Sequence, residues 1–160
     1  MAPNQIIKRK RIAKGLGVQQ VAALTGLSVH EYEDIEQHAD EALGVVHLNK
    51  LKAVCAVLGL DLLSLSGTTC AFCEGRADRD NWQSPRNIVI QRAREHLGLS
   101  KVELGDRIGF EEQAIVDMEQ DPDYLEKWSV ELIQELASIL GVPIEVLLRY
   151  PCGNCGPFDA

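Results

Sequence analysis

The sequence contains an internal duplication, so the fold must be one that a single chain can form twice. When the 160 residues are aligned with themselves at an offset of 83, Gly26 falls on Gly109. After a one-residue indel the offset becomes 82, and Gly59 falls on Gly141. Further matched pairs are Leu16 with Leu99, Val21 with Leu104, Tyr32 with Ile115, Ile35 with Met118, Leu51 with Ile133 and Val54 with Leu136. We therefore expect two units of similar fold.

The duplication also predicts the domain boundaries. The first unit takes residues 1–74 and the second residues 85–160, and the stretch 75–84, rich in Asp, Arg, Asn and Gln, is the expected linker. Apolar residues recur at helical spacing in both units, and no segment shows the sustained alternation of a strand. We expect an all-α fold of two tandem five-helix domains in a pseudo-twofold arrangement.

Short helices are indicated by capping residues as well as by apolar spacing. In the first unit we expect helices around Ile6, Ile7 and Ile12, over residues 18–24, from Ser28 to Ile35, over 48–58 and over 61–65. Ser28 and Glu31 form the pattern of a capping box, as do Ser100 and Glu103 in the second unit. Ser84-Pro85 is expected as a cap and first turn, and Pro143 in another first turn.

Two short helices around a glycine-containing turn, covered by further helices, follow the helix-turn-helix plan. Both units resemble the Cro/C1-type family, the lambda-repressor-like helix-turn-helix domains also called Xre-like. The residues that carry the resemblance are Arg11, Leu16-Gly-Val-Gln-Gln-Val-Ala22, Gly26-Leu-Ser28, Ile35-Glu36 and Leu58-Gly59 in the first unit, and Arg94, Leu99-Ser-Lys-Val-Glu-Leu104, Gly109, Met118-Glu119 and Leu140-Gly141 in the second.

A structural salt bridge is implied by this resemblance in each unit. Arg11 would pair with Glu36 in the first unit. Arg94 would pair with Glu119 in the second, and both pairs are 25 residues apart. These pairs would fix the orientation of the first and third helices and would not contact DNA.

The resemblance further implies that the third helix enters the major groove of double-stranded DNA. The residues then expected to contact DNA in the first unit are Gln19, Gln20, Ser28, Val29, His30 and Glu33, with Lys8, Lys10 and Lys14 near the phosphate backbone. The corresponding face of the second unit carries Glu111, Glu112, Gln113, Val116 and Asp117. Three carboxylates on that face would be repelled by phosphates.

Charge is distributed unequally between the units. The net charge of −8 argues against a protein that coats nucleic acid. Residues 1–66, however, carry seven basic and seven acidic side chains, whereas residues 85–160 carry seven basic and fourteen acidic ones. The acidity therefore belongs to the second unit, and the first keeps basic residues on its first helix.

These patterns predict a DNA-binding transcriptional regulator. The first unit would read DNA, and the acidic second unit would serve dimerisation or regulation, so a homodimer is expected. The alternative is that both units are protein-interaction modules, as in an antiactivator or an antitoxin-like regulator that holds a regulatory protein partner. No catalytic constellation is present in the sequence, so an enzyme is not expected.

Four of the five cysteines form two CxxC pairs, Cys70/Cys73 and Cys152/Cys155, which occupy equivalent positions in the duplication. One pair cannot complete a tetrahedral zinc site, and no histidine recurs in both units. We therefore expect the two pairs to bind one structural Zn²⁺, with Gly75 and Gly156 helping the turns. A redox or iron–sulfur sensor, disulfides, uncoordinated thiols and a zinc shared between chains remain alternatives. Cys55 is expected in the core.

Neither a signal sequence nor a membrane span is evident in the sequence, so a cytoplasmic protein that does not associate with membranes is expected. The basic run Lys8-Arg9-Lys10-Arg11 is interpreted as the solvated face of a helix, with a nuclear-localisation signal as the alternative.

Overall fold

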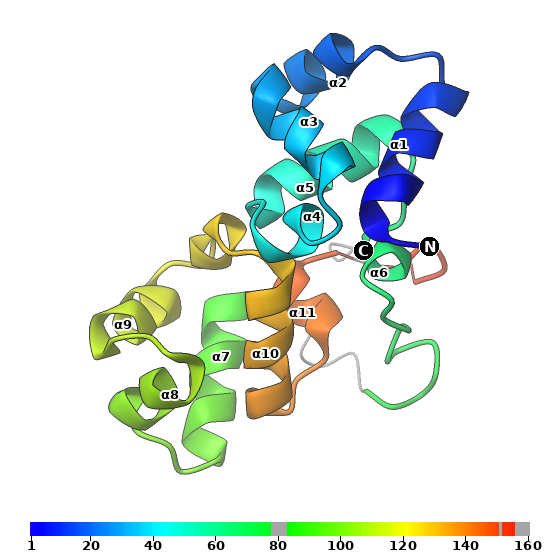
Figure 1. Cartoon of the computed structure of the whole chain (residues 1–160). Helices are drawn as coiled ribbons and strands as arrows, with labels where there is room; N and C mark the ends of the chain where they lie inside the picture. The colour runs from blue at the N-terminus through cyan, green and yellow to red at the C-terminus, as the bar shows by residue number, and fades with distance from the viewer. Residues whose placement is uncertain (78–82, 151, 156–160) are drawn as a thin grey trace.

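The protein is all-helical in the part of the chain that the computed structural model describes, residues 1–77, 83–150 and 152–155. No strand occurs within these ranges. Figure 1 shows two groups of helices along the chain, one from the N-terminal half and one from the C-terminal half, which meet in the middle of the molecule. The all-α prediction is therefore confirmed.

The described helices of the N-terminal half range from four to eleven residues in length. Its helices are α1 (Pro3–Ala13), α2 (Val18–Thr25), α3 (Val29–Gln37), α4 (Glu41–Gly44), α5 (Leu48–Leu58) and α6 (Leu62–Leu65). The expected capping box forms at the start of α3, where Ser28 Oγ accepts from the Glu31 amide and Glu31 accepts from the Ser28 amide. Ile12, one of the apolar residues that marked α1 in the sequence, is 58% exposed.

The C-terminal half repeats this order of elements. They are α7 (Arg86–His96), α8 (Lys101–Ile108), α9 (Glu112–Gln120), the 3-10 helix η2 (Tyr124–Lys127), α10 (Val130–Leu140) and α11 (Ile144–Leu148). The capping box of Ser100 and Glu103 forms as predicted. The prediction of Ser84 as a cap was wrong, because Pro85 takes the N-cap position of α7. Pro143 likewise precedes α11 rather than lying in its first turn.

Within the described residues, each half contains one more short helix than the five expected. Between α3 and α5 the chain forms α4, and between α9 and α10 it forms η2. Both have four residues, too few for apolar periodicity to reveal them, and neither has a side-chain cap such as Asp61 provides for the equally short α6. Glycine ends equivalent helices in both halves, since Gly26 after α2 and Gly109 after α8 have φ of 72° and 77°, a conformation that other residues rarely adopt.

The two short helices contribute to the junction between the halves. α4 packs against α10, and its counterpart η2 packs against α5, so the contacts are reciprocal. The Leu48 amide also donates to the Trp128 carbonyl at 2.8 Å, and Lys52 Nζ lies 2.7 Å from Glu126 Oε1. One buried apolar cluster includes Leu51 from the first half and Ile133 from the second. The halves therefore share a core.

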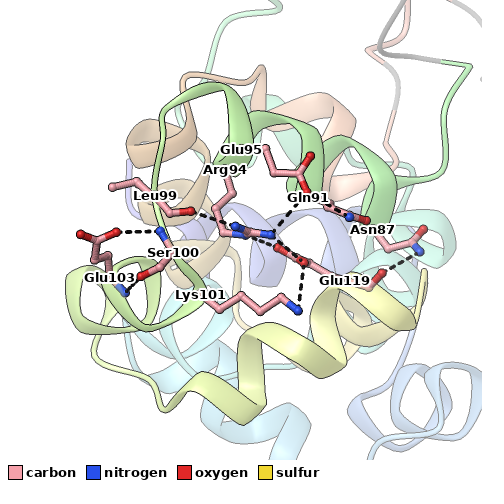
Figure 2. Close-up of polar contacts among 9 residues, drawn as sticks. All are labelled: Asn87, Gln91, Arg94, Glu95, Leu99, Ser100, Lys101, Glu103 and Glu119. Atoms are coloured by element: carbon pink, nitrogen blue, oxygen red, sulfur yellow. Dashed lines mark hydrogen bonds and ion pairs between the residues drawn. The ribbon is translucent and has the colours of Figure 1, made fainter.

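A buried ion pair orients the first and third helices of each half. Arg11 Nε donates to Glu36 Oε1 at 2.6 Å, and Arg94 Nε donates to Glu119 Oε1 at 2.5 Å. Both pairs match the expectation from the sequence. In Figure 2 the Arg94 guanidinium also reaches the Leu99 carbonyl, a hydrogen bond of 2.8 Å. Because the carboxylates are almost fully buried, these contacts fix helix packing within each half.

None of the helices in the described ranges combines the length and the apolar character needed to cross a membrane.

Candidate functional site

The four cysteines of the CxxC pairs come together at the junction of the two halves. Cys70 and Cys73 follow α6, and Cys152 and Cys155 follow α11, so each pair comes from the same place in its own half. Their four Sγ atoms all lie within 4.8 Å of one another. The cluster can therefore hold a metal ion.

The distances between the sulfur atoms test which kind of group fits the cluster. Cys70 Sγ lies 3.6 Å from Cys155 Sγ. Cys73 Sγ lies 3.4 Å from the Sγ atoms of both Cys152 and Cys155. A tetrahedron of thiolates around one ion, with metal–sulfur bonds of about 2.3 Å, has sulfur atoms about 3.8 Å apart. A disulfide would require about 2.05 Å. The arrangement fits a single tetrahedral ion.

Local turns position the cysteines for this arrangement. The Glu74 amide donates to the Cys70 carbonyl at 3.1 Å, and the Cys155 amide donates to the Cys152 carbonyl at 3.1 Å. Gly75 has φ of 69°, which allows the chain to turn two residues after Cys73. The predicted role of Gly156 concerns a residue outside the described ranges. Each CxxC thus forms a compact turn that presents two sulfur atoms.

The thiols differ in how readily they ionise. Burial opposes ionisation of Cys152, but hydrogen bonds from the Cys155 thiol and the Asn154 amide outweigh it and lower the pKa of Cys152 to about 7. Burial, together with the hydrogen bond to Cys152, raises the pKa of Cys155 to about 11. Because a metal binds thiolates, ion uptake at this cluster would release protons from the remaining thiols.

Cys55 takes no part in the cluster. It is fully buried on α5. Burial raises the pKa of its thiol to about 12, so it remains protonated at neutral pH. The prediction that Cys55 is a core residue is confirmed.

The residues predicted to contact DNA lie on the α2 and α3 surface of the first half. Figure 1 shows these two helices side by side at the end of the half that is farther from α10. Gln19, Gln20, Ser28, Val29, His30 and Glu33 are all exposed. Four of them, Gln19, Gln20, Val29 and Glu33, line a shallow hollow of about 470 Å³ together with Gly17 and Val18.

Hydrogen bonding within this surface separates the free side chains from the occupied ones. Gln20 Oε1 accepts from the Gly17 amide at 2.7 Å, so this oxygen is engaged in capping α2. Ser28 Oγ is engaged in the same way at the start of α3. His30 is 84% exposed, with its Nε2 3.6 Å from Asp34 Oδ2. Of the six predicted residues, Gln19, Val29, His30 and Glu33 therefore have side chains that take no part in these caps and can meet a ligand.

The predicted phosphate-contacting lysines are exposed on or near α1. Lys8 and Lys10 lie on α1 itself and are not part of the lining of the hollow. Lys14 Nζ lies 3.7 Å from the position that a Cβ on Gly59 would take, at the C-terminal end of α5. A cation is favoured at such a helix end, so the position of Lys14 suits the stabilisation of α5.

The equivalent surface of the second half has a different composition. Glu111, Glu112 and Gln113 are exposed at the start of α9, and Asp117 is half-buried. Asp117 Oδ1 accepts from Gln113 Nε2 at 2.9 Å. Phe110, in the turn before α9, stacks on Trp128 with ring centroids 4.7 Å apart. The turn before α9 therefore packs against Trp128, and the surface beside it is acidic.

Glu145 is the residue beside the cysteine cluster that sequence reasoning missed. It lies on α11, is 1% exposed, and its Oε1 accepts from the Ala71 amide, inside the first CxxC, at 2.7 Å. The signal in the sequence was a break in the duplication, because the offset of 82 places Glu145 on the apolar Leu63.

Comparison of the chain with protein-family models, with curated proteins and with solved structures found no match. A function for this chain is therefore inferred from the geometry of its own residues.

Proposed function

We propose that the protein is a metal-stabilised transcriptional regulator that binds double-stranded DNA through its first half. In this proposal both halves are Cro/C1-type helix-turn-helix domains in a pseudo-twofold arrangement. The reciprocal contacts of α4 with α10 and of η2 with α5 support that arrangement. The glycine-capped α2 and α8, each followed by a helix of nine residues, support the helix-turn-helix assignment.

The observation that carries the DNA-binding proposal is the exposed surface of α2 and α3. Gln19 offers an amide that can donate to and accept from an adenine edge, and Val29 offers an apolar contact for a thymine methyl. His30 adds an exposed imidazole. Lys8 and Lys10 would provide phosphate contacts from α1. A homodimer would present two such surfaces and double these contacts.

Zinc is the ion that we propose for the four-cysteine cluster. Four thiolates in a tetrahedron match the preference of Zn²⁺ for closed structural sites. The ion would supply no chemistry beyond holding the two CxxC turns together. Because one turn comes from each half, the site would fix the position of the α3 surface relative to the second half.

Titration of the purified protein against a mixed-sequence duplex tests the DNA-binding proposal. At about 50 mM salt, phosphate attraction is strong, so we expect binding at micromolar protein that weakens as salt is raised. Absence of binding under these conditions would contradict the proposal. A variant with Gln19→Ala and Val29→Ala should then lose discrimination between sequences more than it loses non-specific affinity.

A second function is favoured by the acidic surface of α9. Glu111 and Glu112 are exposed there and would be repelled by DNA. If the first half also fails to bind DNA, the proposal becomes a regulator that holds a basic protein partner on the same scaffold, in the manner of an antiactivator or antitoxin-like protein. Recovery of a stoichiometric protein partner without DNA would favour this second function.

A further inference from the structure

Glu145 is a buried carboxylate, and only one of its two oxygens has a hydrogen-bond partner. It is 1% exposed, among the apolar residues of α11. Oε1 accepts from the Ala71 amide at 2.7 Å, whereas Oε2 is buried without a hydrogen-bond partner. Because burying an unsatisfied polar atom costs free energy, a carboxylate here calls for an explanation beyond core packing.

The duplication allows this position to be compared with the equivalent position in the first half, which serves packing alone. Leu63 on α6 is the counterpart of Glu145 and is 2% exposed. A leucine buries the site without any unsatisfied oxygen. The second half has therefore exchanged an apolar side chain for a charged one at a position that the first half uses for its core.

The partner of Glu145 lies between two of the cysteines in the cluster. Ala71 separates Cys70 from Cys73 and is 6% exposed, so its amide has little access to water. The equivalent residue of the second CxxC is Gly153, which is exposed, and a Cβ there would meet no atom within 4 Å. A hydrogen bond from the first CxxC turn to Glu145 thus ties that turn to α11, whereas Gly153 in the second turn is exposed and has no such contact among the described residues.

We infer that Glu145 is a positioning residue of the metal centre, one that orients the first CxxC turn from the opposite half of the chain. The inference rests on the proposed metal site. By fixing the Ala71 amide, Glu145 sets the directions in which Cys70 and Cys73 present their sulfur atoms. Partners of this kind, outside the ligand set, typically change metal affinity 10- to 100-fold when they are removed.

Two substitutions separate the acceptor from the charge. Glu145→Leu restores the residue of the first half and removes the acceptor for the Ala71 amide. Glu145→Gln removes the charge and keeps an oxygen that can accept the same hydrogen bond. Glu135→Gln, at an exposed position on α10, is the control for loss of one negative charge from the second half.

The measurement is metal affinity, by competition between the full-length protein and a chromophoric chelator for Zn²⁺, together with the visible spectrum of the Co²⁺-loaded protein. For Glu145→Leu we expect a 10- to 100-fold loss of affinity and altered Co²⁺ bands. Glu145→Gln and Glu135→Gln should stay close to wild type. The metal-free Glu145→Leu protein should unfold at a temperature close to that of wild type, because the loss of the unsatisfied Oε2 offsets the Ala71 amide that is left without its acceptor. If Glu145→Leu does not fold, Glu145→Met, which also lacks the oxygen acceptor, takes its place.

The outcomes distinguish this inference from the metal site on which it rests. A wild-type protein that binds neither Zn²⁺ nor Co²⁺ would overturn the site itself. A wild-type protein that binds both, with unchanged affinity and spectrum in the variant that lacks the acceptor, would overturn the role of Glu145 alone. Equal losses of metal affinity in Glu145→Gln and Glu135→Gln would show that the effect comes from negative charge. They would likewise contradict a positioning role for Glu145.

Discussion

The two halves of the chain share a scaffold and differ on the surfaces that a ligand would meet. Each half holds its first and third helices together by a buried Arg–Glu pair, and each ends in a CxxC turn. On the surface of the third helix, in contrast, the first half exposes Val29 and His30 and the second exposes Glu111 and Glu112. Duplication has preserved the residues that determine the fold and changed those that would determine binding.

The turn before the third helix shows the same divergence in its packing. Ala22 on α2 corresponds to Gly105 on α8, where a Cβ would lie only 2.5 Å from the Phe110 carbonyl oxygen. The turn of the second half therefore approaches α8 more closely than any residue larger than glycine at position 105 would allow. Phe110 stacks on Trp128, and its counterpart Leu27 is buried, so both halves pack this turn and differ in how closely it approaches the preceding helix.

The largest expected effect comes from cysteines that both halves contribute. Cys73→Ala in the first half and Cys155→Ala in the second should each abolish stoichiometric metal binding, because one tetrahedral site needs all four ligands. The stabilisation by metal, on the order of several kcal/mol for a structural zinc, should disappear in both variants. Metal analysis and thermal unfolding with and without chelator check this.

Cys55→Ala is the control for the cysteine variants, since it should lower stability through a small cavity but keep the metal. Retention of half of the metal in either CxxC variant would contradict a site shared by the halves.

Loss of a buried arginine should have the next largest effect, and of similar size in the two halves. Arg94→Met removes the main partner of buried Glu119 and leaves it Lys101 Nζ at 4.0 Å, and Arg11→Met removes the partner of Glu36. We expect each substitution to lower the free energy of unfolding by about 3–5 kcal/mol, measured by urea denaturation. The double variant Arg94→Met/Glu119→Leu should recover most of the loss. A change below about 1 kcal/mol in either half would contradict a structural role for the pair.

Basic residues of the two halves should differ in their effect on DNA binding. Lys8→Gln and Lys10→Gln remove exposed charges from α1, and each lost phosphate contact should reduce the slope of log affinity against log salt by about 1. Arg107→Gln and Lys127→Gln remove exposed charges from the second half and should leave the slope unchanged. Equal reductions from both sets would mean that the first half is not the DNA reader.

The smallest effect concerns the capping boxes and depends on pH. Hydrogen bonds from the Ser28 amide, and then from Lys50, lower the pKa of Glu31 from 4.5 to about 2. Because the folded state favours the carboxylate, its stabilisation is complete above pH 4.5 and is lost as pH falls from 4.5 towards 2. Glu31→Gln should therefore reduce the loss of stability between pH 6 and pH 3, measured by urea denaturation.

Glu103 is the matched residue of the second half. Hydrogen bonds with Ser100 also lower its pKa, but no lysine bonds to it as Lys50 does to Glu31 in the described structure. Glu103→Gln should therefore change the pH dependence less than Glu31→Gln. The opposite order would contradict the contribution of Lys50.

The sequence predicted much of this architecture because the features involved are local or repeated. Capping boxes at Ser28 and Ser100 and the meeting of the CxxC pairs could both be inferred from spacing and duplication. The helices α4 and η2 could not, since four residues carry no period and neither helix has a side-chain cap such as Asp61 provides for α6. The junction contact between Lys52 and Glu126 could not be predicted either. Glu145 was visible only as a mismatch, because its partner Ala71 lies 74 residues away and only the fold brings them together.

Native mass spectrometry of the intact protein tests most directly whether a single ion joins the two halves. We expect one Zn²⁺ on each chain, including monomeric chains, with Cys70, Cys73, Cys152 and Cys155 protected from alkylation until a chelator is added. A metal-free protein with four reactive thiols and a stability that chelator does not change would contradict the account. Metal found only in dimers would contradict a site within one chain.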